Sequence, residues 1–183
     1  MKNIRSKRGQ RGFSILETVF AGAIMFVALS GIIGLFAHSL LALQYAQEDL
    51  IAKQKAREAL EAVFNARNTA EITFAMLNNV STGGIFVDSW QPLRTAGVDG
   101  IIGTADDGAV ETIVFPGPDG VIGTGDDVIT PLSNFSRRIT IAPVTDALGV
   151  ANPDLNQVTV DVRYTVGQLT RTYTAVSYIS RYR

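Results

Sequence analysis

The sequence contains no cysteine and a single histidine, His38, among its 183 residues. Without thiols the chain cannot form a disulfide, a cysteine-ligated zinc site or an iron–sulfur cluster, and it has no thiolate nucleophile. Because the chain has only one imidazole, we do not expect Ser-His-Asp catalysis or a histidine-rich metal centre. We therefore expect that this protein is not an enzyme.

Charged residues are also scarce, at 18% of the chain, below the roughly 25% typical of soluble domains. They are unevenly placed, because residues 1–12 carry five bases and no acid, which leaves 11 bases against 17 acids in the rest of the chain. A basic stub directly before an apolar run is typical of a segment that stays on the cytoplasmic side of a membrane. No aromatic residue lies among these bases, so we do not predict nucleic-acid binding.

The apolar run itself covers residues 18–37, a stretch of twenty residues without a charge. This is about the length that a helix needs to cross the hydrocarbon core of a membrane, at about 1.5 Å per residue. A secretory signal peptide usually has a shorter apolar region, of about 7 to 15 residues, followed by a cleavage site of small residues. Neither feature fits well here, so we expect a transmembrane helix that the chain retains.

Glu17 is the only charged residue between Phe13 and Ala37. A carboxylate in lipid is strongly disfavoured unless it has a partner. One explanation is that Glu17 lies at the membrane interface near the start of the helix, where the helix dipole favours a negative charge.

Residues 7–17 (KRGQRGFSILE) resemble the cleavage signal of type IV prepilins and pseudopilins. The shared features are a basic leader that ends in glycine, then phenylalanine, then a glutamate, then a long apolar helix. The resemblance implies that a prepilin peptidase cuts between Gly12 and Phe13 and methylates the new amino terminus. It also implies that Glu17 neutralises the Phe13 ammonium group, commonly that of a neighbouring subunit, during filament assembly. Such pairing makes a carboxylate tolerable inside an apolar helix bundle.

Within this family the chain is most similar to minor pilins of the PilV type and to GspI-like pseudopilins. The resemblance implies a structural subunit of a pilus-like filament, whose partners are other pilin-like subunits and the prepilin peptidase. Before assembly the chain would cross the inner membrane once, with its leader in the cytoplasm and its head outside. The alternative is a pseudopilin of a type II secretion system, although the insert at residues 97–127 gives a larger head and favours the pilus.

Beyond Ala37 the pattern becomes amphipathic, with apolar residues at helical spacing and no proline or glycine. This predicts one helix from about residue 14 to about residue 67, whose second half packs against a globular head. The period then changes to two. The strand candidates are residues 85–87, 112–115, 137–142, 157–166 and 169–180, of which the last two form a hairpin around Gly167.

The predicted fold class is therefore α+β, with a long N-terminal helix packed on an antiparallel sheet. We divide the chain into a cleaved basic leader (1–12), a transmembrane half-helix (13–37), an amphipathic half-helix (38–67) and a β-rich head (68–183). The head contains the insert at 97–127, which is rich in aspartate and glycine.

Two segments of this insert repeat one pattern at a distance of twenty residues, DGIIGTADD at 99–107 and DGVIGTGDD at 119–127. The carboxylates are those of Asp99, Asp106 and Asp107 in the first copy and of Asp119, Asp126 and Asp127 in the second.

Clustered carboxylates are the hard oxygen ligands that Ca²⁺ prefers, and the copies resemble the Asp/Gly-rich calcium loops of extracellular bacterial proteins. The alternative is a pair of plain turns, in which aspartate accepts backbone N–H groups and glycine supplies positive φ. If the loops bind calcium and the helix is only an anchor, the protein would be a membrane-anchored calcium-binding module that does not polymerise.

Overall fold

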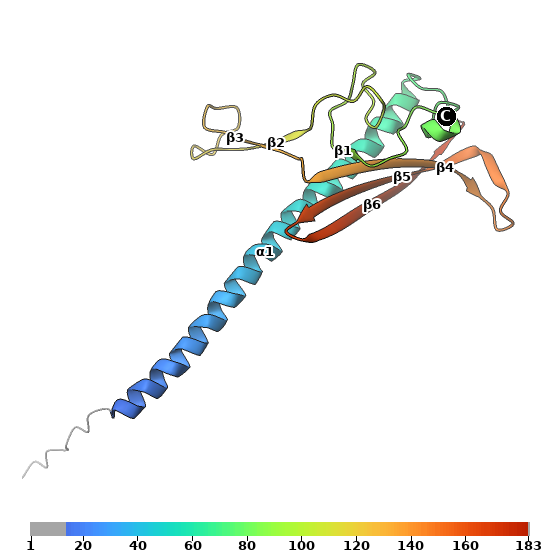
Figure 1. The fold of residues 1–183 in the computed structure, drawn as a ribbon. Coiled ribbons are helices and arrows are strands. Elements are labelled where there is room, and N and C mark those ends of the chain that lie inside the picture. Colours follow the sequence, from blue (N-terminus) through green and yellow to red (C-terminus); the bar gives the residue numbers. More distant parts are fainter. Residues whose placement is uncertain (1–13, 183) are drawn as a thin grey trace, which may run out of the picture. The chain divides into compact units, whose positions relative to one another are not determined.

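The computed structural model describes residues 14–182, and Figure 1 shows its helix and strands. The elements are α1 (Ile15–Asn68), the short 3-10 helix η1 (Val80–Thr82), and the strands β1 (Gln91–Pro92), β2 (Thr112–Phe115), β3 (Val128–Pro131), β4 (Phe135–Thr145), β5 (Ala151–Val166) and β6 (Leu169–Ser180). Four strands form an antiparallel sheet in the order β1-β4-β5-β6, and β2 pairs with β3 in a separate antiparallel ribbon. The fold is α+β, with one long N-terminal helix and an antiparallel sheet, as the sequence predicts.

The chain divides into two units at the junction between Gln44 and Tyr45. In the described part of the first unit, residues 14–44, α1 is continuous and every side chain is exposed. The prediction of a helix from about residue 14 to about residue 67 is confirmed by the bounds of α1.

The second unit contains the hydrophobic core, which lies between the second half of α1 and one face of the large sheet. The helix contributes small side chains to this core, and Ala52, Ala56 and Ala59 are fully buried. The facing side chains of β5 follow the predicted alternation, with Val158, Val160, Val162, Tyr164 and Val166 all buried.

Four of the five predicted strand segments are strands in the structure. Strands β2 and β6 have the predicted bounds, and β4 and β5 contain the predicted segments within longer strands. The prediction of a strand at 85–87 is wrong, because Phe86 makes only an isolated bridge with Asn79. The Phe86 side chain is fully buried, so its apolar character reflects core packing and not a strand.

The side chain of Asn79 covers part of the edge of β4. Its side-chain nitrogen donates to the carbonyl of Ile139 at 2.8 Å, and its side-chain oxygen accepts the N–H of Ile141 at 2.8 Å. The buried amide thus pairs with the backbone of β4 as a neighbouring strand would. This contact holds the segment after α1 against the sheet.

Candidate functional site

The N-terminal candidate residues fall at and before the start of α1. Gly12 and Phe13 lie outside the described residues. Glu17 is in the first turn of α1 with an exposed side chain, and within residues 14–182 it makes no ion pair. The helix contains a segment long and apolar enough to cross a membrane, and none of that segment is buried by the rest of the described chain. Glu17 is therefore an isolated carboxylate on an otherwise uncharged, exposed apolar surface.

The first copy of the repeat folds into a closed turn, here called the first loop (residues 97–107). One oxygen of Asp106 accepts the N–H of Asp99 at 3.2 Å, and the other accepts the hydroxyl of Thr104 at 2.7 Å. The next carboxylate, that of Asp107, accepts the N–H of Gly103 at 2.9 Å. The aspartates thus join the two ends of the loop through its own backbone.

The second copy, here called the second loop (residues 117–127), repeats this network. The carboxylate of Asp126 accepts the N–H of Asp119 at 3.3 Å and the hydroxyl of Thr124 at 2.5 Å. Asp127 accepts the N–H of Gly123 at 2.6 Å. Because the same bonds recur at equivalent positions, the repeat in sequence is also a repeat in structure.

The structural repeat begins two residues before the repeat that the sequence analysis identified. An added Cβ at Gly97 would collide with Asp106, and an added Cβ at Gly117 would collide with Asp126. Each glycine lets the backbone pass directly over the aspartate that closes its loop. Both stand two residues before the first aspartate of their copy, so a wider alignment of the two copies reveals them.

Two neighbouring carboxylates of the first loop, those of Asp106 and Asp107, have pKa values shifted in opposite directions. The threonine hydroxyl that donates to Asp106 lowers the pKa of that carboxyl, and Thr124 lowers the pKa of Asp126 in the same way. Burial instead raises the pKa of Asp107. The two neighbours differ because the side chain of Asp107 is partly buried, whereas that of Asp106 is exposed.

These hydrogen bonds are those that the plain-turn alternative predicts, because the carboxylates bind the N–H groups of their own loops. In the described part of the chain, no group of three acidic or histidine side chains is arranged to hold a metal ion. Calcium binding by Asp99, Asp106, Asp107, Asp119, Asp126 and Asp127 stays a prediction.

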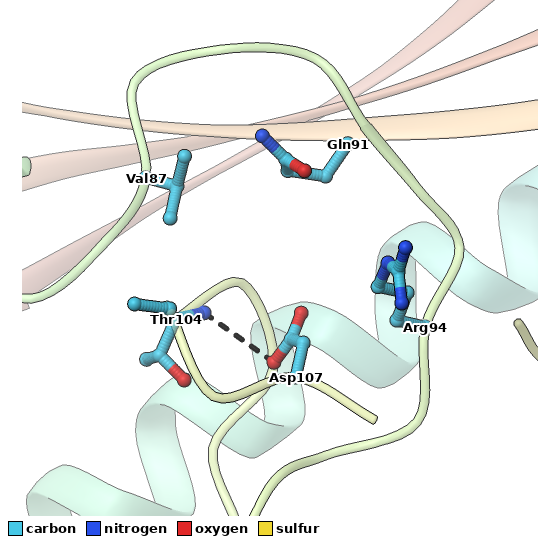
Figure 2. Close-up of a pocket in the computed structure, with 6 residues that line it drawn as sticks. Val87, Gln91, Arg94, Thr104 and Asp107 are labelled. Atoms are coloured by element: carbon cyan, nitrogen blue, oxygen red, sulfur yellow. Dashed lines mark hydrogen bonds between the residues drawn. The ribbon is translucent and has the colours of Figure 1, made fainter. Parts of the chain in front are cut away.

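A polar pocket of about 340 Å³ adjoins the first loop. Figure 2 shows Asp107 and Thr104 on one side of it and Val87 and Gln91 on the other, with Arg94 nearby. The polar groups are already engaged, since Arg94 donates to the carbonyl of Gly108 at 2.7 Å and Asp107 binds the backbone of its loop. We therefore interpret the pocket as a packing gap beside the first loop.

A buried ion cluster joins α1, the insert and the sheet. The carboxylate of Glu111 lies 2.6 Å from Nζ of Lys55 and 3.4 Å from Nη1 of Arg137. Burial lowers the pKa of the Arg137 guanidinium, while Glu111 supplies the charge that compensates it. The sequence analysis did not predict this cluster, because its members follow no local motif. Lys55 and Glu111 are 56 residues apart along the chain, and Glu111 and Arg137 are 26 residues apart.

Trp90 forms a second unpredicted cluster, on the face of the sheet that does not contact α1. Its ring lies 4.8 Å from the guanidinium carbon of Arg138 and 4.3 Å from that of Arg163. Both arginines also have polar partners, Asp161 for Arg138 and Ser136 for Arg163. These contacts support a role in fixing β1 at the edge of the sheet.

Comparisons of the chain with protein-family models, with curated proteins and with solved structures give no match.

Proposed function

We propose that this protein is a structural subunit of a type IV pilus-like filament, similar to a minor pilin. A prepilin peptidase would remove residues 1–12 and methylate Phe13, and the chain would then leave the inner membrane as its helix packs against those of other subunits. A pseudopilin of a type II secretion system would use the same residues in the same way. The two proposed functions, pilus subunit and pseudopilin, differ in the filament that the subunit joins.

The observation that carries this proposal is Glu17 on the exposed apolar surface of α1. All side chains from residue 14 to residue 44 are exposed, so nothing within residues 14–182 covers this half of the helix, and lipid or other chains would have to cover it. A carboxylate on such a surface is costly in either setting unless a cation meets it. The amino terminus created at Phe13 would be a cation close to the same end of a neighbouring helix.

A membrane-anchored module remains the alternative from a different functional class. In that reading the helix holds the head at the membrane and does not polymerise. A simple anchor has no use for Gly12, Phe13 and Glu17 at this spacing, so processing of the chain separates the two functions.

The first test is the intact mass and the N-terminal sequence of the full chain, expressed with and without a prepilin peptidase. We expect loss of residues 1–12 and methylation of Phe13 only when the peptidase is present. A matched variant, Gly12→Val, should stay uncut because its side chain blocks entry of the backbone into the protease cleft. An unchanged wild-type chain would overturn the proposal in favour of the anchor.

The second test concerns assembly. We expect Glu17→Ala to be cleaved like the wild type but to be largely lost from sheared filaments, since the ammonium group of the neighbouring subunit loses its partner. Glu61→Ala serves as the control, because Glu61 is exposed on the same helix within the head. Normal incorporation of Glu17→Ala would contradict the proposed pairing.

A further inference from the structure

The two loops share one fold but differ in what surrounds them. In the first loop, Ile101 is only 3% exposed. A Cβ placed on Gly103 would lie 2.7 Å from Cδ1 of Ile139, and the carbonyl of Gly103 accepts the N–H of Val87 at 2.9 Å. The first loop is therefore docked on the head through its aliphatic tip.

The second loop presents the equivalent tip to solvent. Val121, which corresponds to Ile101, is 55% exposed, and Ile122 is 65% exposed. Among the described residues, the hydrogen bonds of this loop stay within residues 117–127. The repeat thus includes one docked copy and one copy with the same docking surface uncovered.

The second loop is carried by the ribbon of β2 and β3, which Figure 1 shows projecting away from the large sheet. We call residues 112–131 the arm. Its base is anchored, because Ile113 packs against the core and the N–H of Leu132 donates to the carbonyl of Glu111 at 2.9 Å. Farther out, Val128 and Ile129 are exposed. A two-stranded ribbon with exposed aliphatic residues is marginally stable alone, which favours a partner for it.

The charge of the arm indicates the kind of surface that fits it. Residues 112–131 contain three aspartates and no basic residue. A complementary surface must combine exposed aliphatic area with positive charge. The outer face of the sheet fits poorly, because Arg138 already pairs with Asp161 and both Arg138 and Arg163 lie against Trp90.

A groove on the exposed face of α1 has the required character. It has a volume of about 230 Å³ and is lined by Leu50, Lys53, Gln54 and Arg57. Leu50 is 67% exposed. Lys53 pairs with Asp49 at 2.7 Å, whereas Arg57 has no carboxylate within 4.0 Å in the part of the chain that the structure describes.

We propose that the arm of one copy of this chain docks on the α1 groove of a second copy, with Val121 and Ile122 against Leu50 and the aspartates of the second loop near Arg57. This contact rests on the proposed function, because assembly into a filament brings the heads of its subunits together. It would bury the aliphatic tip of the second loop as the head buries that of the first.

The test uses the absence of cysteine from the chain. Full-length chains carrying Ile122→Cys and Gln54→Cys, with different affinity tags, are co-expressed with the peptidase and the assembly machinery, and disulfides are formed in whole cells by copper-catalysed oxidation. We expect a disulfide between the two tagged chains. Leu148→Cys replaces Ile122→Cys as the control, since Leu148 is an aliphatic residue on another hairpin and is more accessible, 88% exposed against 65% for Ile122.

A charge reversal tests the specificity of the contact. In the Gln54→Cys chain, Arg57→Glu should lower the rate of cross-linking about tenfold through repulsion from the aspartates, whereas Arg57→Lys should keep the rate near that of the parent. Equal rates for Ile122→Cys and Leu148→Cys, or no effect of Arg57→Glu, would overturn the arm contact.

Filament yield separates failure of this contact from failure of the proposed function. No cross-link in cells that release filaments containing the chain would overturn the arm contact alone and leave the filament function standing. A specific cross-link in cells whose filaments lack the chain would support the arm contact and overturn the filament function.

Discussion

Glu111 is the acidic residue that Lys55 and Arg137 share in the buried ion cluster of the head. Its carboxylate is nearly buried and lies between Lys55 and Arg137, both of which are also shielded from solvent. A buried ion pair contributes little compared with a well-packed apolar replacement, but loss of one partner leaves an uncompensated buried charge. The structural effect of this cluster is therefore clearest when one member is removed.

We expect Glu111→Ala to lower the free energy of unfolding by about 3 to 5 kcal/mol, because Arg137 would remain buried without its counter-charge. Glu58→Ala is the control, since Glu58 pairs with the same lysine from an exposed position and such pairs contribute at most about 1 kcal/mol. Urea denaturation followed by circular dichroism measures both. Equal effects of the two variants would show that the cluster is not a buried ion network.

Asp126 gives a residue-scale prediction for pH. Thr124 lowers the pKa of this carboxyl, so the interaction stabilises the second loop above the ordinary aspartate pKa and is lost as pH falls through the lowered value. Below about pH 4 the wild-type loop should open progressively. Thr124→Val should raise the pKa of Asp126 toward its ordinary range, which carboxyl chemical shifts in a pH titration would detect.

Asp107 provides the internal comparison for this titration. Burial raises its pKa, so its contribution has the opposite sign and is lost as pH rises through the raised value. Thr124→Val should leave the midpoint of Asp107 unchanged, because the two residues belong to different loops. A shift of both midpoints would mean that the substitution disturbs the whole insert.

At the scale of elements, the second half of α1 packs against the sheet through alanines. Ala52, Ala56 and Ala59 lie on one face at helical spacing and are fully buried. Interiors of this density do not accept extra methylene groups without displacement of the backbone. The spacing between helix and sheet is thus set by the smallest side chains of the core.

Ala59→Leu should destabilise the head by about 1 to 3 kcal/mol through overpacking. Gln54→Leu places the same new side chain on the exposed face of the same helix and should leave the stability nearly unchanged. Thermal unfolding of the full chain in detergent micelles compares the two. A stable Ala59→Leu variant would contradict tight packing around the buried Ala59 side chain.

The aspartate loops support a second prediction at this scale. If the loops bind calcium, millimolar Ca²⁺ should raise the melting temperature of the full chain, since ligand binding to the folded state stabilises it. A chain with Asp119→Asn and Asp126→Asn should lose part of the shift, and Mg²⁺ serves as the ionic control. No shift with Ca²⁺ would leave the loops as plain turns.

At the scale of the whole molecule, the chain consists of two units with different surroundings. The second unit has its own core, formed by α1 from Tyr45 onward and by the sheet. The first unit has only exposed side chains in its described part. The stability of the head should therefore not require the apolar half of the helix.

A fragment of residues 45–183 should fold without detergent and unfold in one cooperative transition, with the near-ultraviolet circular dichroism of the full chain. The full chain should need detergent or lipid at the same concentration. A fragment that lacks fixed tertiary signals would show that the first half of α1 contributes to folding of the head.

The sequence by itself determined the features that depend on local pattern. The apolar run and the amphipathic segment after it predicted α1 to within about one residue at each end. Alternation of apolar residues predicted residues 157–166 of β5, and the turn at Gly167 predicted β6 as its partner. Residues 85–87 show the limit of this reasoning, because three apolar side chains of a strand and of a packed loop look alike.

The tertiary structure alone decided which residues meet across long separations. Lys55, Glu111 and Arg137 gather around one buried charge, and Asn79 completes the edge of β4. It also decided that two nearly identical loops have different surroundings, since the head covers the first and leaves the second exposed. Local sequence specifies the turn, whereas burial depends on where the rest of the chain places it.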